Sequence, residues 1–169
     1  MWLSFNVGYP NALERSLGFS GGDIMVHGTC SSRGCYAMTN EQIEEIYAIV
    51  REAFQGGQKQ IQFQSFPFRM TAENMARFRN DPNINFWKNL KQGSDRFDVT
   101  KRDVMVGYCG NRYAFSSTNQ PSCAPNDNDE ANELVMEKTR ADEEKAAQLA
   151  ASGTSSIRMQ YADGDQHPY

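Results

Sequence analysis

Residues 27–39 read His27-Gly-Thr-Cys30-Ser-Ser-Arg-Gly-Cys35-Tyr-Ala-Met-Thr39, and this stretch carries the most reactive side chains of the chain. His27 ends a short apolar run that predicts a buried strand, and Cys35 follows eight residues later. A free cysteine has a pKa of about 8.5, so a thiolate at neutral pH needs a nearby imidazole. The intervening loop, with its two glycines, can fold back and bring the two side chains together. The stretch therefore predicts a cysteine–histidine site for acyl transfer.

Gly34, directly before Cys35, would allow a sharp turn that directs backbone N–H groups toward a developing oxyanion. The spacing alone leaves two alternatives open. His27, Cys30 and Cys35 could ligate zinc, but zinc sites favour pairs of close cysteines and a fourth ligand, so no metal is predicted. They could also be inert strand-end and core residues, because buried thiols usually do no chemistry.

Around this stretch the sequence predicts short strands and amphipathic helices, which is an α+β pattern. Thr39 and Gln42 have the spacing of a capping box, and the apolar residues that follow recur at helical spacing until Gly56-Gly57. The other predicted elements are a strand at 61–66, helices beginning at Thr71 and covering 86–90, a hairpin at 104–115, and a solvated helix at 128–151.

Length, charge and hydropathy exclude two classes of protein. A chain of 169 residues suits a single domain. Its longest unbroken apolar run, residues 46–50, is far shorter than the ~20 residues that a membrane span requires. A formal net charge of −4 disfavours a nucleic-acid partner. We expect neither a membrane span nor nucleic-acid binding.

The charge is unevenly distributed along the chain. Residues 120–169 hold ten acidic and four basic side chains, and their only aromatic residues are Tyr161 and Tyr169. Such a composition buries too little apolar area to offset the entropy of ordering. The sequence therefore predicts a globular part at 1–119 and an acidic, low-complexity tail at 120–169.

The string from Met25 to Thr39 resembles the active-site segment of the L,D-transpeptidase catalytic domain, the YkuD-type family, and most closely its YafK-like branch. That branch pairs an upstream His-Gly with Ser-x-Gly-Cys-Tyr-Ala-Met at this short separation. Further motifs agree in order and extend the resemblance over about residues 3–115: SFNVGYPN at 4–11, FPFRMT at 66–71, WKNLKQG at 87–93 and CGNRY at 109–113.

The resemblance implies an α+β fold in which a mixed, β-sandwich-like sheet is flanked by helices. In the family, further strands precede the segment with which this chain begins. We therefore expect residues 1–119 to form a partial catalytic domain that lacks the N-terminal strands, followed by the polar C-terminal tail.

The resemblance also implies a reaction on peptidoglycan. A cysteine thiolate attacks the carbonyl of the third residue of the stem peptide, and a thioester forms. Carried over to this chain, Cys35 is the nucleophile, His27 is the general base, and backbone N–H groups at Gly34 and Cys35 stabilise the oxyanion. Ser32 matches a Ser/Thr position that orders the loop. No cofactor is implied.

Three further side chains are candidates for substrate binding. Arg33 replaces a second histidine of many relatives, and it either grips a substrate carboxylate or is a solvated loop arginine. Tyr36 either lines the cleft or packs beside the thiol. Arg69 either contacts substrate or holds the loop after the strand, and the second role is favoured.

The partners implied are peptidoglycan stem peptides and an amine acceptor, which includes an envelope protein. Water as the acceptor would make the protein a hydrolase on the same bond, and a chain without the first strands could be an inactive, wall-binding remnant. The family implies the periplasm or cell envelope, although the sequence shows no signal peptide. An exported protein with four cysteines also permits disulfides.

Overall fold

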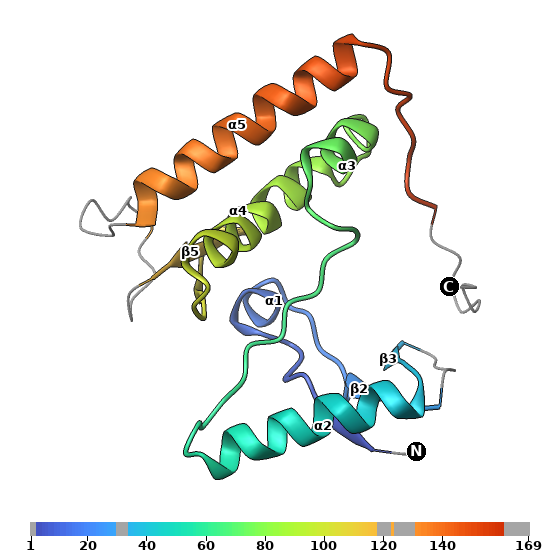
Figure 1. The fold of residues 1–169 in the computed structure, drawn as a ribbon, viewed down its shortest axis with the longest axis vertical. Coiled ribbons are helices and arrows are strands. Elements are labelled where there is room, and N and C mark those ends of the chain that lie inside the picture. Colours follow the sequence, from blue (N-terminus) through green and yellow to red (C-terminus); the bar gives the residue numbers. More distant parts are fainter. Residues whose placement is uncertain (1–2, 30–33, 118–122, 124–130, 161–169) are drawn as a thin grey trace. The chain divides into compact units, whose positions relative to one another are not determined.

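The computed structural model describes residues 3–29, 34–117, 123 and 131–160. The chain divides into two compact units, unit 1 containing the described residues up to 63 and unit 2 those from 64 to 160 (Figure 1). Both units combine helices with a small sheet, which confirms the α+β class. None of the helices in the described ranges is long and apolar enough to cross a membrane.

Unit 1 is built on a small mixed sheet. Its strands are β1 (Ser4–Asn6), β2 (Met25–His27) and β3 (Tyr36–Ala37), and its helices are α1 (Ala12–Ser16) and α2 (Asn40–Gln55). The strand order is β1-β2-β3, with β1 antiparallel and β3 parallel to the central β2. The buried strand that was predicted to end at His27 is therefore present as β2, and it occupies the centre of the sheet.

Helix α2 begins as the sequence predicts. The Thr39 hydroxyl accepts from the Gln42 N–H at 3.2 Å, and the Gln42 side chain accepts from the Thr39 N–H at 3.1 Å. Ile43 lies on the face that contacts β1 and β2, and it is fully buried. The capping box thus starts the helix, and burial of its apolar face holds it on the sheet.

Helix α1 was not predicted, although its signal is present in the sequence. Asn11 and Glu14 form a reciprocal capping box, with hydrogen bonds of 3.1 and 2.6 Å. Asn followed three residues later by Glu is the same pattern that identifies α2. The helix turns the chain between β1 and β2, and Leu13 is its buried residue.

Unit 2 contains three helices and a hairpin among its described residues: α3 (Ala72–Arg77), α4 (Ile84–Thr100), β4 (Met105–Cys109), β5 (Arg112–Ser116) and α5 (Ala131–Ala151). The predicted hairpin is confirmed, and Gly110 takes the positive φ of 57° that its turn requires. The Asn89 side chain accepts from the Tyr113 N–H and donates to the Tyr113 carbonyl, which ties α4 to β5.

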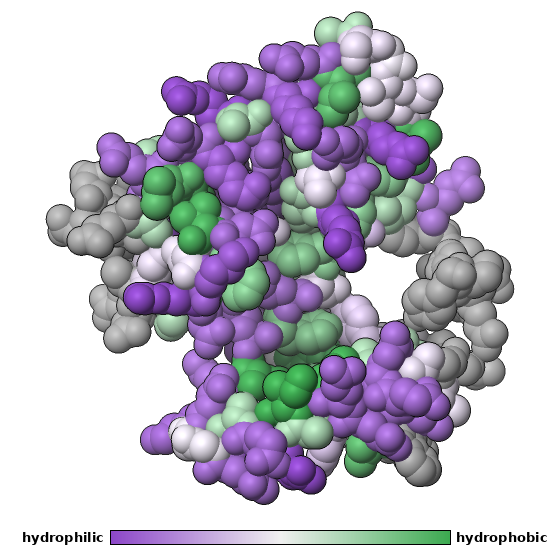
Figure 2. Space-filling model, viewed as in Figure 1, coloured by the Kyte–Doolittle hydropathy of each residue, from purple (hydrophilic) through white to green (hydrophobic). Residues whose placement is uncertain are grey.

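The acidic segment is part of the packing of unit 2. Helix α5 lies along α3 and α4 (Figure 1), and its Val135 is buried. Its other side chains are mainly hydrophilic (Figure 2), in keeping with the solvated helix that the sequence predicts. The boundary at 119/120 between a catalytic domain and a tail stays a prediction. The two compact units of the structure divide after residue 63.

The prediction of a strand at 61–66 is wrong. The segment alternates apolar and polar residues, but it has no strand assignment in the structure. A strand is completed by hydrogen bonds to a partner strand, and neither sheet of the described chain includes this segment. Residues 61–66 instead contain the boundary between the two units.

Candidate functional site

The parallel pairing of β2 and β3 brings the two predicted catalytic segments next to each other. His27 lies opposite Ala37, and Val26 lies opposite Tyr36. Cys35 directly precedes β3, two residues before Ala37. The pairing therefore sets the segment that carries Cys35 beside the strand that ends in His27.

The His27 ring is buried, at 5% exposure, and one of its nitrogens is engaged by the backbone. Its Nδ1 lies 2.5 Å from the Gly28 carbonyl oxygen. A carbonyl can only accept, so Nδ1 carries the proton in this contact. In the neutral ring Nε2 is then the acceptor, which is the state that a general base requires.

Cys35 is half-buried and, of the described cysteines, it is the one outside the disulfide. Its Sγ donates a long hydrogen bond of 3.9 Å to the Asp23 carbonyl, just before β2. This contact and that of His27 are with two different carbonyls, near opposite ends of β2.

Gly34 has a φ of +100°, in the region that favours glycine. No heavy atom of the described residues lies within 4 Å of the position that a Cβ would take, so the backbone conformation is what makes glycine suitable there. The turn that was predicted directly before Cys35 is present. Cys30, Ser32 and Arg33 lie outside the described residues.

Tyr36 is 41% exposed and its ring meets Phe63 edge-on, with 5.0 Å between ring centroids. It is the first residue of β3 and directly follows Cys35. Phe63 was not singled out from the sequence, because its contact with Tyr36 joins residues 27 positions apart. The pair is an aromatic contact that involves the residue directly after the candidate nucleophile.

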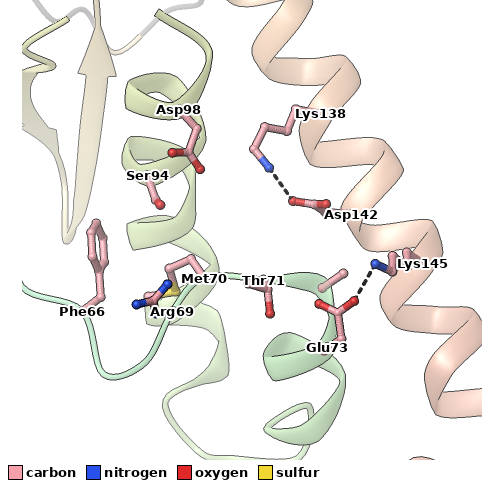
Figure 3. Close-up of a pocket in the computed structure, with 11 residues that line it drawn as sticks. Phe66, Arg69, Met70, Thr71, Glu73, Ser94, Asp98, Lys138, Asp142 and Lys145 are labelled. Atoms are coloured by element: carbon pink, nitrogen blue, oxygen red, sulfur yellow. Dashed lines mark hydrogen bonds and ion pairs between the residues drawn. The ribbon is translucent and has the colours of Figure 1, made fainter. Parts of the chain in front are cut away.

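Arg69, the remaining candidate, belongs to unit 2. It borders a cavity of about 510 Å³ between α3, α4 and α5 (Figure 3). The cavity is lined by apolar, hydroxyl and charged side chains: Phe66, Arg69, Met70, Thr71, Ala72, Glu73, Ser94, Asp98, Lys138, Asp142 and Lys145. Sequence reasoning missed this cavity because its walls come from three segments that are far apart along the chain.

Acidic and basic side chains are paired where α5 meets the rest of unit 2. Lys145 on α5 contacts Glu73 on α3 at 2.5 Å, and this hydrogen bond lowers the pKa of Glu73 to about 2. Partial burial opposes ionisation of Asp142, but hydrogen bonds from Lys91 and Lys138 outweigh it and lower the Asp142 pKa. Both carboxyl groups are therefore charged at neutral pH.

Cys109 and Cys123 form a disulfide, with 5.4 Å between their Cα atoms. The bond joins the end of β4 to a residue that precedes α5. Among the described residues, no group of three or more His, Cys, Asp or Glu side chains is placed to hold a metal ion.

Comparison with known proteins gives one kind of relative. No family model matches the chain. Two curated proteins, each named "Putative L,D-transpeptidase YafK" and from Escherichia coli strains K12 and O157:H7, are 42% identical to it over 115 residues. The match covers 68% of this chain and 47% of each relative, so the chain spans about half the length of the curated relatives that it matches.

Proposed function

Because the chain is related to the YafK-like L,D-transpeptidases, we propose that it carries the reactive part of a cysteine acyltransferase that acts on peptidoglycan stem peptides. The observation that carries the proposal is the parallel pairing of β2 and β3, which sets the His27 strand beside the Cys35 segment. The hydrogen bond of His27 Nδ1 with the Gly28 carbonyl, which leaves Nε2 to act as the acceptor, supports the role of a base.

In the proposed reaction His27 Nε2 takes the proton of the Cys35 thiol, and the thiolate attacks the carbonyl of the third residue of the stem peptide. The backbone N–H groups of Gly34 and Cys35 donate to the oxyanion, an effect commonly worth ~3 kcal/mol for each donor. The tetrahedral intermediate collapses as His27 returns the proton to the leaving amine, which leaves a thioester on Cys35. An amine acceptor, such as an envelope protein, then attacks the thioester and frees the thiol.

The roles of the neighbouring residues are part of the same proposal. Ser32 orders the loop before the nucleophile, and Arg33 binds a substrate carboxylate unless it is simply solvated. Tyr36 contributes an exposed aromatic surface at the edge of the site, and its contact with Phe63 supports a packing role as well. Arg69 contacts substrate or holds its loop.

We also propose that the small sheet of unit 1 is part of the mixed, β-sandwich-like sheet of the family. It already combines one antiparallel and one parallel pair, which supports this assignment. The periplasm or cell envelope is the proposed location. The Cys109–Cys123 disulfide supports it, because disulfides persist in oxidising compartments and are rare in the cytosol.

Intact-mass spectrometry after incubation with a carbapenem tests the proposal, since this reagent acylates a reactive thiolate of this kind. We expect one adduct on the wild-type chain, none on Cys35→Ala, and a slower reaction on His27→Ala. His167→Ala is the matched control, because His167 is the other of the chain's two histidines, and it should react like wild type. A folded wild-type chain without an adduct would refute the thiolate site and leave the inactive wall-binding remnant.

Muropeptide analysis then separates transfer from hydrolysis on the same acyl-enzyme. New cross-links or exchanged D-amino acids would show transfer to an amine. Shortened or released peptides alone would show that water is the acceptor.

A further inference from the structure

The cavity of unit 2 is bordered by a cation, Arg69, that no described residue neutralises. Of the three basic residues that line it, Lys138 hydrogen-bonds to Asp142 at 3.0 Å and Lys145 to Glu73 at 2.5 Å. The Arg69 guanidinium makes neither a hydrogen bond nor an ion pair with any described residue. Figure 3 shows these two pairs at the α5 side of the cavity and Arg69 apart from them.

The backbone of Arg69, not its side chain, holds the loop in place. Its carbonyl accepts from the Thr71 N–H at 2.7 Å and from the Asn74 side-chain amide at 2.9 Å. The loop-holding role that the sequence suggests for Arg69 is thus supplied by its carbonyl group. The guanidinium is left beside the cavity, where its planar fork of donors matches the geometry of a carboxylate.

The other lining residues limit the class of anion. Three acidic residues, Glu73, Asp98 and Asp142, line the cavity beside its three basic residues, so the lining has no excess of positive charge that would favour a multiply charged anion such as phosphate. Phe66 and the buried Met70 provide apolar surface next to Arg69. A singly charged carboxylate attached to a short apolar group satisfies both conditions.

We propose that the cavity between α3, α4 and α5 is a binding site for a small organic carboxylate, which Arg69 holds by its charged end. Its walls include Lys138, Asp142 and Lys145, so the acidic segment that carries α5 contributes one side of the site. The identification of the ligand with a peptide carboxylate of peptidoglycan rests on the proposed function. The inference that the cavity binds a small carboxylate is independent of the proposed function.

Titration with sodium butyrate, followed by the NMR signals of the amides of Thr71 and Ser94, tests the inference. The titrated chain carries Cys35→Ala, so a failure to bind butyrate counts only against the cavity site. The carbapenem reaction tests the Cys35 thiol separately. We expect saturable binding, at least ten times tighter for butyrate than for butylamine or inorganic phosphate. Arg69→Gln should weaken binding by at least five-fold.

Arg102→Gln is the matched control, because Arg102 is also an exposed arginine of unit 2 but does not line the cavity. It should bind butyrate as tightly as the parent chain. Ser94→Leu, which fills the cavity and keeps Arg69, should also weaken binding. Absence of saturation, equal affinity for phosphate, or equal affinity in the Arg69→Gln and Arg102→Gln variants would overturn the proposal.

Discussion

Gly93 of α4 packs against the ring of Phe115 on β5, and the approach is so close that any larger residue would displace the ring. A Cβ at residue 93 would lie 2.7 Å from Cε1 of that ring. At the scale of the residue, the absence of a side chain therefore allows the hairpin to pack on the helix. The WKNLKQG motif includes this glycine, but its sequence context gives no indication of the contact.

We predict that Gly93→Val destabilises the protein by about 2 kcal/mol, because the added branches must displace the Phe115 ring. Urea unfolding of the variant and of wild type measures the difference. Gly22→Val is the control, since no heavy atom lies near its Cβ position and its φ is ordinary. An unchanged free energy of unfolding for Gly93→Val would contradict the packing argument.

The candidate catalytic residues also belong to the scale of the residue. His27 and Cys35 were identified from residue type and spacing, and Gly34 was identified because a turn was needed before the cysteine. The structure bears out that turn with a positive φ. The catalytic roles stay a prediction until the carbapenem experiment is done.

At the scale of the element, the contact of α4 with α5 is held by a buried ionic network. Lys91 contacts both carboxylate oxygens of Asp95 at 2.6 and 2.8 Å, and Asp142 of α5 at 2.6 Å. The Lys91 and Asp95 side chains are 6% and 1% exposed. Lys138 of α5 completes the network at 3.4 Å from Asp95.

We predict that Lys91→Met destabilises the protein by about 3 kcal/mol, because the buried Asp95 carboxylate then loses the ammonium group that neutralises it. The double variant Lys91→Met, Asp95→Leu should be more stable than the single variant, since it also removes that carboxylate. Thermal or urea unfolding provides the measurement. Lys88→Met, at an exposed position on the same helix, should have little effect. A double variant less stable than the single one would contradict this account.

At the scale of the whole molecule, the charged groups determine how stability depends on pH. The pKa of Glu73 is lowered to about 2 by Lys145, and the pKa values of Glu41 and Asp142 are lowered as well. A carboxyl group with a lowered folded-state pKa stabilises the fold above its unfolded pKa and loses that contribution as pH falls. The pKa values of Lys138 and Lys145 are raised, so the stability that these groups contribute is lost only as pH rises into strong base.

We therefore predict that the free energy of unfolding decreases as pH falls from about 5 toward 2. Lys145→Gln should make the decrease shallower, because the Glu73 pKa is then no longer held down by a cation. Urea titrations at several pH values, for wild type and this variant, measure both effects. A stability that stays constant or rises over this interval would contradict the prediction.

The sequence by itself determined the features that depend on neighbouring residues. The Thr39–Gln42 capping box, the hairpin turn at Gly110 and the motif that contains His27 and Cys35 could all be found there, because each arises within a few residues of chain. The capping box of α1 could also have been found, since Asn11 and Glu14 have the same spacing.

The tertiary structure alone decided what depends on contacts between distant residues. It set the register that brings His27 beside Ala37, gave residues 61–66 no place in either sheet of the described chain, and packed the acidic α5 against α3 and α4. It also formed the cavity beside Arg69 from segments far apart in sequence. Local propensity and composition carry no information on which distant surface a segment meets, and burial and ion pairing at that surface determine these features.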